Sequence, residues 1–125
     1  MQKTRQININ GSGGAFTKIR TSITAFRMLI QEDLAANAGV SQGLQYQMAT
    51  IVGSDVTYGP TLETSEPIEI VGSAGDTNPH KEPIGTGGSS PNPVAPGGPV
   101  TLGTIILQIK SASATPTTID VTEWA

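Results

Sequence analysis

Two stretches near the end of the chain alternate between large aliphatic and polar residues. In Ile105–Lys110 three aliphatic side chains fall on one face of an extended strand, and in Thr117–Thr122 the residues Ile119 and Val121 do the same. Alternation with a period of two is typical of a strand that buries one face. Because the residues between the stretches are small and polar and end in Pro116, we predict a β-hairpin that forms the core of a small β-domain.

Other alternating or apolar stretches predict further strands. They lie at Thr4–Asn10, Leu44–Val52, Val56–Tyr58 and Pro67–Val71. Gly, Pro and Ser between them mark turns. Only Ile7 and Ile9 anchor the first of these strands in a core, so we expect it to lie at the edge of a sheet.

The segment Ala15–Asp33 is compatible with two structures. Its apolar residues recur at a helical spacing, but its many β-branched residues disfavour a helix interior. We therefore expect two strands, or one long strand with a bulge near Thr24–Ala25, in preference to a helix. The loop that follows, Glu32–Gly43, is expected to hold one helical turn over Asp33–Asn37 that ends at Gly39.

The stretch Gly72–Thr101 differs from the rest of the chain in composition. It is dense in Gly, Pro and Ser, and only Ile84, Val94 and Val100 are large and apolar. Such a stretch buries too little surface to fold alone, and its prolines favour extended, polyproline-like geometry. We interpret it as an arm that reaches a neighbouring subunit; the alternative is a long loop on the surface of its own subunit.

The composition agrees with an all-β fold. The 125 residues suffice for one domain with one modest core, only 14% of them are charged, and Thr, Ser, Gly and Ile are prominent. About seven or eight short strands separated by turns favour a small, jelly-roll-like β-sandwich. We predict a single β-domain over residues 1–125 that contains the Gly/Pro-rich arm, residues 72–101.

Charge is unevenly distributed, although the formal net charge is only −3. The basic residues that precede every acidic one are Lys3, Arg5, Lys18, Arg20 and Arg27. Acidic residues dominate afterwards, so the two parts can attract each other between neighbouring subunits; the alternative is that both are solvated faces. Dispersed basic residues without interleaved aromatic ones make a poor nucleic-acid site. No apolar run approaches the length of a membrane span, and the first residues lack the apolar core of a secretory signal.

Residues that could carry out catalysis or hold a cofactor are few. The chain has no cysteine, and its single histidine, His80, falls in the Gly/Pro-rich stretch. A hydrolase triad would depend on His80, which we interpret as an exposed loop residue. The oxygen-rich run Asp76–His80 lacks the later Gly and Glu of an EF-hand, and the Gly clusters match no phosphate-binding motif. We predict no enzymatic activity, no cofactor and no metal.

Aromatic residues are scarce, which limits carbohydrate binding. A sugar-binding sandwich normally uses an aromatic platform, and Tyr46 and Trp124 are the candidates to test by mutation. Trp124, one residue from the end, fits better as an anchor packed on a neighbour or as a residue that closes the sandwich.

Two stretches resemble a known group of proteins. RTSITAFRMLI (Arg20–Ile30) resembles the early strands of small β-sandwich virion proteins of tailed bacteriophages. TIILQIKSASATPTTIDVTEW (Thr104–Trp124) resembles their C-terminal hairpin. The resemblance lies in the pattern of residues along the strands. It implies a virion structural protein: a capsid decoration (cement) protein, or a component of a fibre or tail. Such proteins are often trimeric.

We therefore expect a non-enzymatic virion protein that binds the outer surface of a capsid as an oligomer, most simply a homotrimer. Its partners would be the major capsid protein or another virion protein, and further copies of itself, with neither nucleic acid nor membrane. A fibre, tail or baseplate adaptor, or a carbohydrate-binding module, is the alternative. The residues expected to contact partners are Lys3, Arg5, Lys18, Arg20, Arg27, Pro91, Pro93, Pro96 and Trp124.

Overall fold

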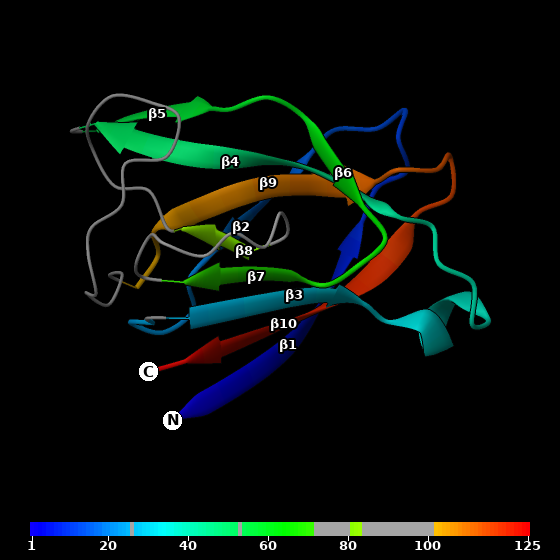
Figure 1. Ribbon diagram of the computed structural model, residues 1–125, viewed down its shortest axis with the longest axis horizontal. Coiled ribbons are helices and arrows are strands. Elements are labelled where there is room, and N and C mark those ends of the chain that lie inside the picture. The colour runs from blue at the N-terminus through cyan, green and yellow to red at the C-terminus, as the bar shows by residue number, and fades with distance from the viewer. Residues whose placement is uncertain (26, 53, 72–80, 84–101) are drawn as a thin grey trace.

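The computed structural model is a β-sandwich of two facing sheets (Figure 1). It describes residues 1–25, 27–52, 54–71, 81–83 and 102–125. The elements are β1 (Gln2–Ile9), β2 (Thr17–Arg20), β3 (Arg27–Glu32), the 3-10 helix η1 (Leu34–Asn37), β4 (Leu44–Val52), β5 (Asp55–Tyr58), β6 (Leu62–Thr64), β7 (Ile68–Val71), β8 (Lys81–Pro83), β9 (Ile105–Ser111) and β10 (Thr117–Trp124). The predicted all-β fold is confirmed, with β6 and β8 in addition to the strands expected.

The order of the strands is that of a jelly roll. Sheet A runs β1-β10-β3-β7-β8, and sheet B runs β2-β9-β4-β5, with β6 also paired to β4. The first and last strands pair with each other, then β2 with β9, then β3 with β7, and finally β4 with β5 and β6. Because successive pairs alternate between the sheets, the chain wraps around the core as a jelly roll does.

The predicted hairpin at the end of the chain is wrong, although both of its strands are present. β9 lies in sheet B between β2 and β4, whereas β10 lies in sheet A between β1 and β3. Their apolar faces meet across the sandwich, since Leu107 and Ile109 belong to the same buried cluster as Ile119 and Val121. Alternation identifies the buried face of a strand but not its hydrogen-bonded neighbour.

The connection between β9 and β10 crosses from one sheet to the other. The turn after β1 closes against it, where Ser12 N donates to Ser113 O at 2.8 Å. Gly11 is buried at this crossing, and a Cβ there would lie 2.2 Å from the Ala114 carbonyl oxygen. Only glycine allows two backbone segments to approach so closely.

Most other predicted elements agree with the structure. Ala15–Asp33 contains β2 and β3, so the strands predicted there are confirmed over a helix. The predicted helical turn is η1, whose cap Asp33 accepts a hydrogen bond from Ala36 N at 3.3 Å. Gly39 follows with φ of 80°, which favours glycine.

The predicted arm, residues 72–101, is only partly within the described residues. Its described part, Lys81–Pro83, is β8, which pairs in parallel with β7 at the margin of sheet A. These three residues therefore belong to the body of the domain and not to a free arm. Residues 72–80 and 84–101 lie outside the described part of the chain.

Among the described residues, the core cluster between the sheets is aliphatic apart from Tyr46. The buried cluster consists of Ile9, Ile19, Met28, Ile30, Leu44, Tyr46, Met48, Ile68, Ile70, Ile106, Leu107, Ile109, Ile119 and Val121. Tyr46 is only 1% exposed, so the prediction that it could form a carbohydrate platform is wrong. Its ring instead packs in the interior, where an aromatic side chain contributes a large apolar area.

The strands run between two ends of the sandwich. At the termini end the first and last residues pair: Met1 N donates to Ala125 O at 2.9 Å, and Ala125 N donates to Met1 O at 2.9 Å. The far end contains η1 and the crossing between β9 and β10 (Figure 1). The candidate functional residues divide between these two ends.

Candidate functional site

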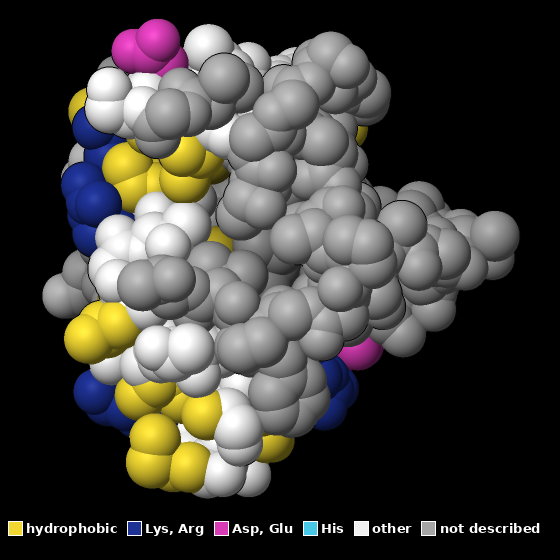
Figure 2. All heavy atoms as spheres, turned by 90° about the vertical axis from the view of Figure 1, so that its left-hand side faces the viewer, with side chains coloured by type: hydrophobic (Ala, Val, Ile, Leu, Met, Phe, Trp, Pro, Cys, Tyr) yellow, Lys and Arg dark blue, Asp and Glu magenta, His cyan; other side chains and the backbone are white. Residues whose placement is uncertain are grey.

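Most of the basic residues predicted to bind a partner gather at the termini end together with Trp124. The residues at this end are Lys3 and Arg5 of β1, Arg20 at the end of β2, Arg27 at the start of β3, and Trp124 at the end of β10. Figure 2 faces this end and shows Lys and Arg side chains along its margins, with hydrophobic side chains between them. Lys18 lies further along β2, opposite Gln108, and Pro91, Pro93 and Pro96 lie outside the described residues.

Arg5 is partly buried and pairs with a fully buried carboxylate. Its Nη1 lies 3.2 Å from Oε1 of Glu123, which is 0% exposed. Ser22 N donates to the same carboxylate at 3.0 and 3.1 Å, and the Ser22 hydroxyl also donates to it. Arg5 Nη2 donates in addition to the Arg20 carbonyl oxygen. The guanidinium therefore connects the edges of the two sheets, and its charge is neutralised within the domain.

Arg27 lies on the outward face of sheet A, over the indole of Trp124. Its Cζ is 4.2 Å from the ring centroid, and its Nε is 3.2 Å from Oε1 of Glu69. The side chains of Arg27 and Glu69 are 38% and 27% exposed. Stacking of a guanidinium on an indole orients both groups while leaving the cluster open to solvent.

Lys3, Lys18 and Arg20 are exposed. Arg20 Nη1 donates to the Gly103 carbonyl oxygen at 3.2 Å, which leaves its charge without a carboxylate partner among the described residues. The free positive charge at the termini end therefore comes from Lys3 and Arg20, with a contribution from the partly exposed Arg27.

The far end carries four carboxylates. These are Glu32 at the end of β3, Asp33 directly after it, Glu63 of β6 and Glu66 in the turn that follows. Glu32 accepts a hydrogen bond from Gln42 N at 2.7 Å, and Glu63 accepts one from the side chain of Gln45. The separation of charge is incomplete, because the exposed Asp55 begins β5 at the termini end and Lys110 lies near the far end of β9.

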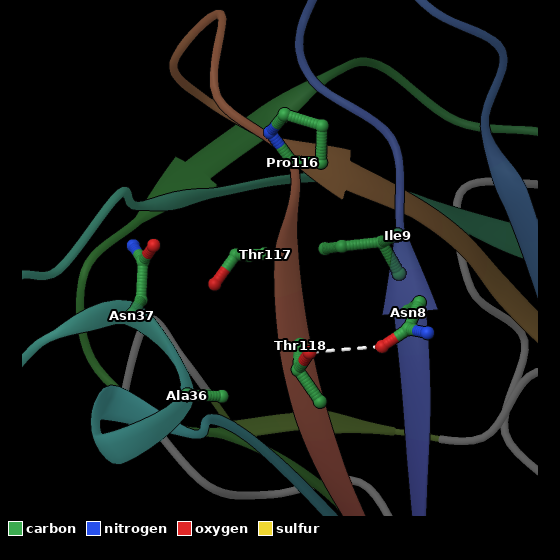
Figure 3. A pocket seen from close by; sticks show the side chains of 7 residues that line it. All are labelled: Asn8, Ile9, Ala36, Asn37, Pro116, Thr117 and Thr118. Carbon is green, nitrogen blue, oxygen red and sulfur yellow. Dashed lines mark hydrogen bonds between the residues drawn. The ribbon is translucent and has the colours of Figure 1, made fainter.

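A pocket of about 290 Å³ opens at the far end (Figure 3). It is lined by Asn8, Ile9, Ala36, Asn37, Pro116, Thr117 and Thr118, none of which is charged. Its amides are partly occupied, since Asn8 Oδ1 accepts from Thr118 Oγ1 at 2.9 Å and Asn37 Nδ2 donates to Val40 O at 3.0 Å. Each amide keeps its other polar atom for a ligand.

The hydroxyl of Thr117 stands out among the groups of this pocket. Thr117 is 6% exposed, and its Oγ1 has no hydrogen-bond partner within the described structure. Figure 3 shows this oxygen directed toward the wall of the pocket that carries Asn37. A buried hydroxyl without a partner is uncommon because desolvation is not compensated.

Sequence reasoning missed Glu123, Ser22 and the pocket. Glu123 is in phase with the buried Ile119 and Val121 on its strand, and Arg5 is in phase with Ile7 and Ile9. The sequence therefore held a usable signal for this pair: charges of opposite sign on the apolar faces of two strands. The sequence held no comparable signal for the pocket, because the pocket joins residues from three separate elements.

Within the described ranges, no three His, Cys, Asp or Glu side chains lie close enough together to hold a metal ion. No helix of the described chain has the length and apolar character that crossing a membrane requires. His80 lies outside the described residues. No protein-family model, curated protein or solved structure matches this chain.

Proposed function

We propose that this chain is a non-enzymatic structural protein of a tailed-bacteriophage virion that docks on the outer surface of a capsid as an oligomer. The observation that carries the proposal is that Lys3, Arg20, Arg27 and Trp124 all lie at the termini end, where Arg27 covers the ring of Trp124. Arg and Trp are enriched at the centres of protein interfaces. The termini end is therefore the docking end.

The exposed basic residues of the docking end support the same orientation. Lys3 and Arg20 are attracted to an acidic surface, and the carboxylates of the far end are repelled by it, which favours docking through the termini end. Jelly rolls occur in viral capsid proteins, but also in lectins and cupins, so the fold alone does not decide the function. The virion assignment rests on the resemblance of two stretches to tailed-phage β-sandwich proteins.

A pelleting assay with empty capsids tests this function. The capsids are assembled from the major capsid protein encoded in the same genome, and binding of the full chain is measured at several salt concentrations. Lys3→Ala combined with Arg20→Ala is expected to weaken binding at least about tenfold, or about 1.4 kcal/mol. The matched control combines Lys18→Ala with Lys110→Ala, two basic residues away from the docking end, and should leave binding nearly unchanged.

Sedimentation equilibrium of the same samples measures the oligomeric state. A monomer that stays in the supernatant with capsids at low salt would refute the proposed function. Equal losses from the two double variants would refute the docking end while leaving capsid binding intact.

A second candidate function is the binding of a small uncharged polar ligand, such as one sugar unit, in the far-end pocket. The unpartnered hydroxyl of Thr117 favours it, because a ligand hydroxyl could supply the missing hydrogen bond. Uncharged amide and hydroxyl groups on the lining suit a neutral, polyhydroxylated molecule better than an ion. The ligand would then be held on the end opposite to the docking end.

Two matched threonine variants test the pocket. Thr117→Val should abolish binding in a glycan array and leave stability unchanged or raise it by up to about 1 kcal/mol, since it removes an unpaired buried hydroxyl. Thr122→Val is the control, because Thr122 is 7% exposed and its Oγ1 lies 3.0 Å from Thr4 Oγ1. The control should lose about 1 kcal/mol of stability and keep any binding. An array without hits, or hits that Thr117→Val retains, would dismiss this candidate.

A further inference from the structure

The backbone of β1 has a free edge whose residues can be identified from the register. Met1 and Ala125 exchange both backbone hydrogen bonds, so in the antiparallel ladder every second residue of β1 from Met1 onward faces β10. The other ladder of β10 agrees, because Asp33 N donates to Thr118 O at 2.9 Å and the even-numbered residues of β10 thus face β3. The N–H and C=O groups that point away from β10 are those of Gln2, Thr4, Gln6 and Asn8.

These four residues are exposed, and within the described structure β1 pairs with β10 alone. Figure 1 shows β1 at the margin of its sheet. The strand contains no proline, and its register with β10 is continuous from Gln2 to Ile9. A long regular edge of this kind is a template for a further strand.

The side chains along this edge specify what such a strand would carry. Ile7, Arg5 and Lys3 lie on the face of β1 that turns toward sheet B, and Ile7 packs against the core cluster. Arg5 also reaches the carbonyl of Arg20 on the neighbouring edge strand β2. An added strand therefore meets Ile7, then Arg5, whose charge Glu123 neutralises, and then the exposed Lys3 on its inward side.

We propose that the edge of β1 accepts an extended segment of a partner protein as an additional antiparallel strand. The segment carries an apolar residue opposite Ile7, an uncharged residue opposite Arg5 and an acidic residue opposite Lys3. Main-chain hydrogen bonds to the four free residues supply affinity, and the acidic side chain supplies specificity. This deepens the proposed function, on which it rests for the existence of a partner protein, by naming the chemistry of the segment that is bound.

A second copy of β1 is a poorer occupant. Symmetric antiparallel pairing that uses all four free residues places the axis at Arg5, so that each Lys3 lies opposite an Ile7. The ammonium group of Lys3 then meets an apolar side chain, and self-pairing supplies no ion pair across the ladder. An acidic strand supplies one.

The probe is the capped peptide Thr-Val-Thr-Thr-Thr-Glu-Thr, which places Val opposite Ile7 and Glu opposite Lys3, with a control peptide in which Lys replaces the Glu residue. Amide hydrogen exchange is followed by NMR on the full chain. In the free protein the amides of Arg5, Ile7 and Ile9 should be protected, and those of Thr4, Gln6 and Asn8 should exchange fast. Saturating acidic peptide should slow the second group at least about tenfold, and the basic peptide should not.

A proline substitution tests the backbone contribution. Gln6→Pro removes an N–H that points away from β10, and Gln6→Ala is its matched control, because both lose the bond from Gln6 Nε2 to Asp33 Oδ2 at 2.7 Å. The proline variant should bind the acidic peptide at least about tenfold more weakly than the alanine variant. Urea unfolding of both variants verifies that the fold is retained. If the proline variant is unfolded, the proposal is judged by the amide exchange of the native chain with the two peptides.

Three results would overturn the proposal: no protection of Thr4, Gln6 and Asn8 by the acidic peptide, equal binding of the basic peptide, or binding that Gln6→Pro leaves intact. Protection of the same amides in a self-associated free chain would identify a second copy as the occupant and also overturn it. These outcomes are independent of capsid pelleting. Capsid binding that survives Gln6→Pro removes the strand-addition mechanism and leaves the proposed function standing.

Discussion

Glu123 and Trp124 are consecutive residues of β10, and each meets an arginine in a different environment. Glu123 points between the sheets, is fully buried, and accepts hydrogen bonds from Arg5 and Ser22. Trp124 points outward, where Arg27 covers its ring at 4.2 Å and also pairs with Glu69. One step along a strand thus separates an internal charge cluster from a surface one.

The difference shows that two arginines from the same basic part of the sequence have different roles, one in folding and one at the surface. Both arginines belong to the basic N-terminal part of the chain, and charge alone does not distinguish them. The inward cluster holds a desolvated carboxylate, so losing one partner leaves a buried group unsatisfied. The outward cluster is hydrated and contributes little to folding, which leaves Arg27 and Trp124 free to contribute to binding.

Removing the buried carboxylate should have the largest effect. Glu123→Ala leaves a cavity and takes the shared acceptor from Arg5 and from Ser22, so we expect a loss of about 3 kcal/mol or more in the free energy of unfolding. Urea unfolding followed by circular dichroism measures it. Glu123→Gln keeps the volume and one acceptor, so its loss should be smaller. A loss below about 1 kcal/mol for Glu123→Ala would mean that the cluster contributes no more than a surface ion pair.

Removing the arginine of the same cluster should have an intermediate effect. Arg5→Met leaves the carboxylate of Glu123 with hydrogen bonds from Ser22 alone, which should cost about 2 kcal/mol. The free energy of unfolding of Arg5→Lys should lie between those of Arg5→Met and the native protein. An ammonium lacks the planar fork that reaches Glu123 and the Arg20 carbonyl together. Because Glu123 is fully buried and Arg5 is only 25% exposed, the loss in Arg5→Met should change little with salt in urea unfolding. If the stability loss of Arg5→Met vanishes at high salt, Arg5 behaves as a surface charge and the prediction is wrong.

Particular residues show how far sequence reasoning reaches. The strands and their buried faces were predictable, because Leu107 and Ile109, like Ile119 and Val121, alternate with polar residues. The pairing of β9 and β10 was not, because two apolar faces that pack across a sandwich have the same pattern as two that share a sheet. The candidate site was predictable as a set of basic residues with Trp124. The phase of Arg5 with Ile7 and Ile9 indicates that it turns inward, but its partner Glu123 lies 118 residues away and could not be identified from the sequence.

The surface cluster gives the smallest expected effect and the most direct contrast. Arg27→Met removes an exposed ion pair and a cation–π contact, so the free energy of unfolding should fall by less than about 1 kcal/mol. Part of that loss should disappear at high salt, because Arg27 and Glu69 are partly exposed. Trp124 is the only tryptophan, so its emission reports the site directly and should shift to longer wavelength as water replaces the guanidinium. If Arg27→Met destabilises as much as Arg5→Met, the outward cluster is structural, and Trp124 is held in place for the fold instead of being presented to a partner.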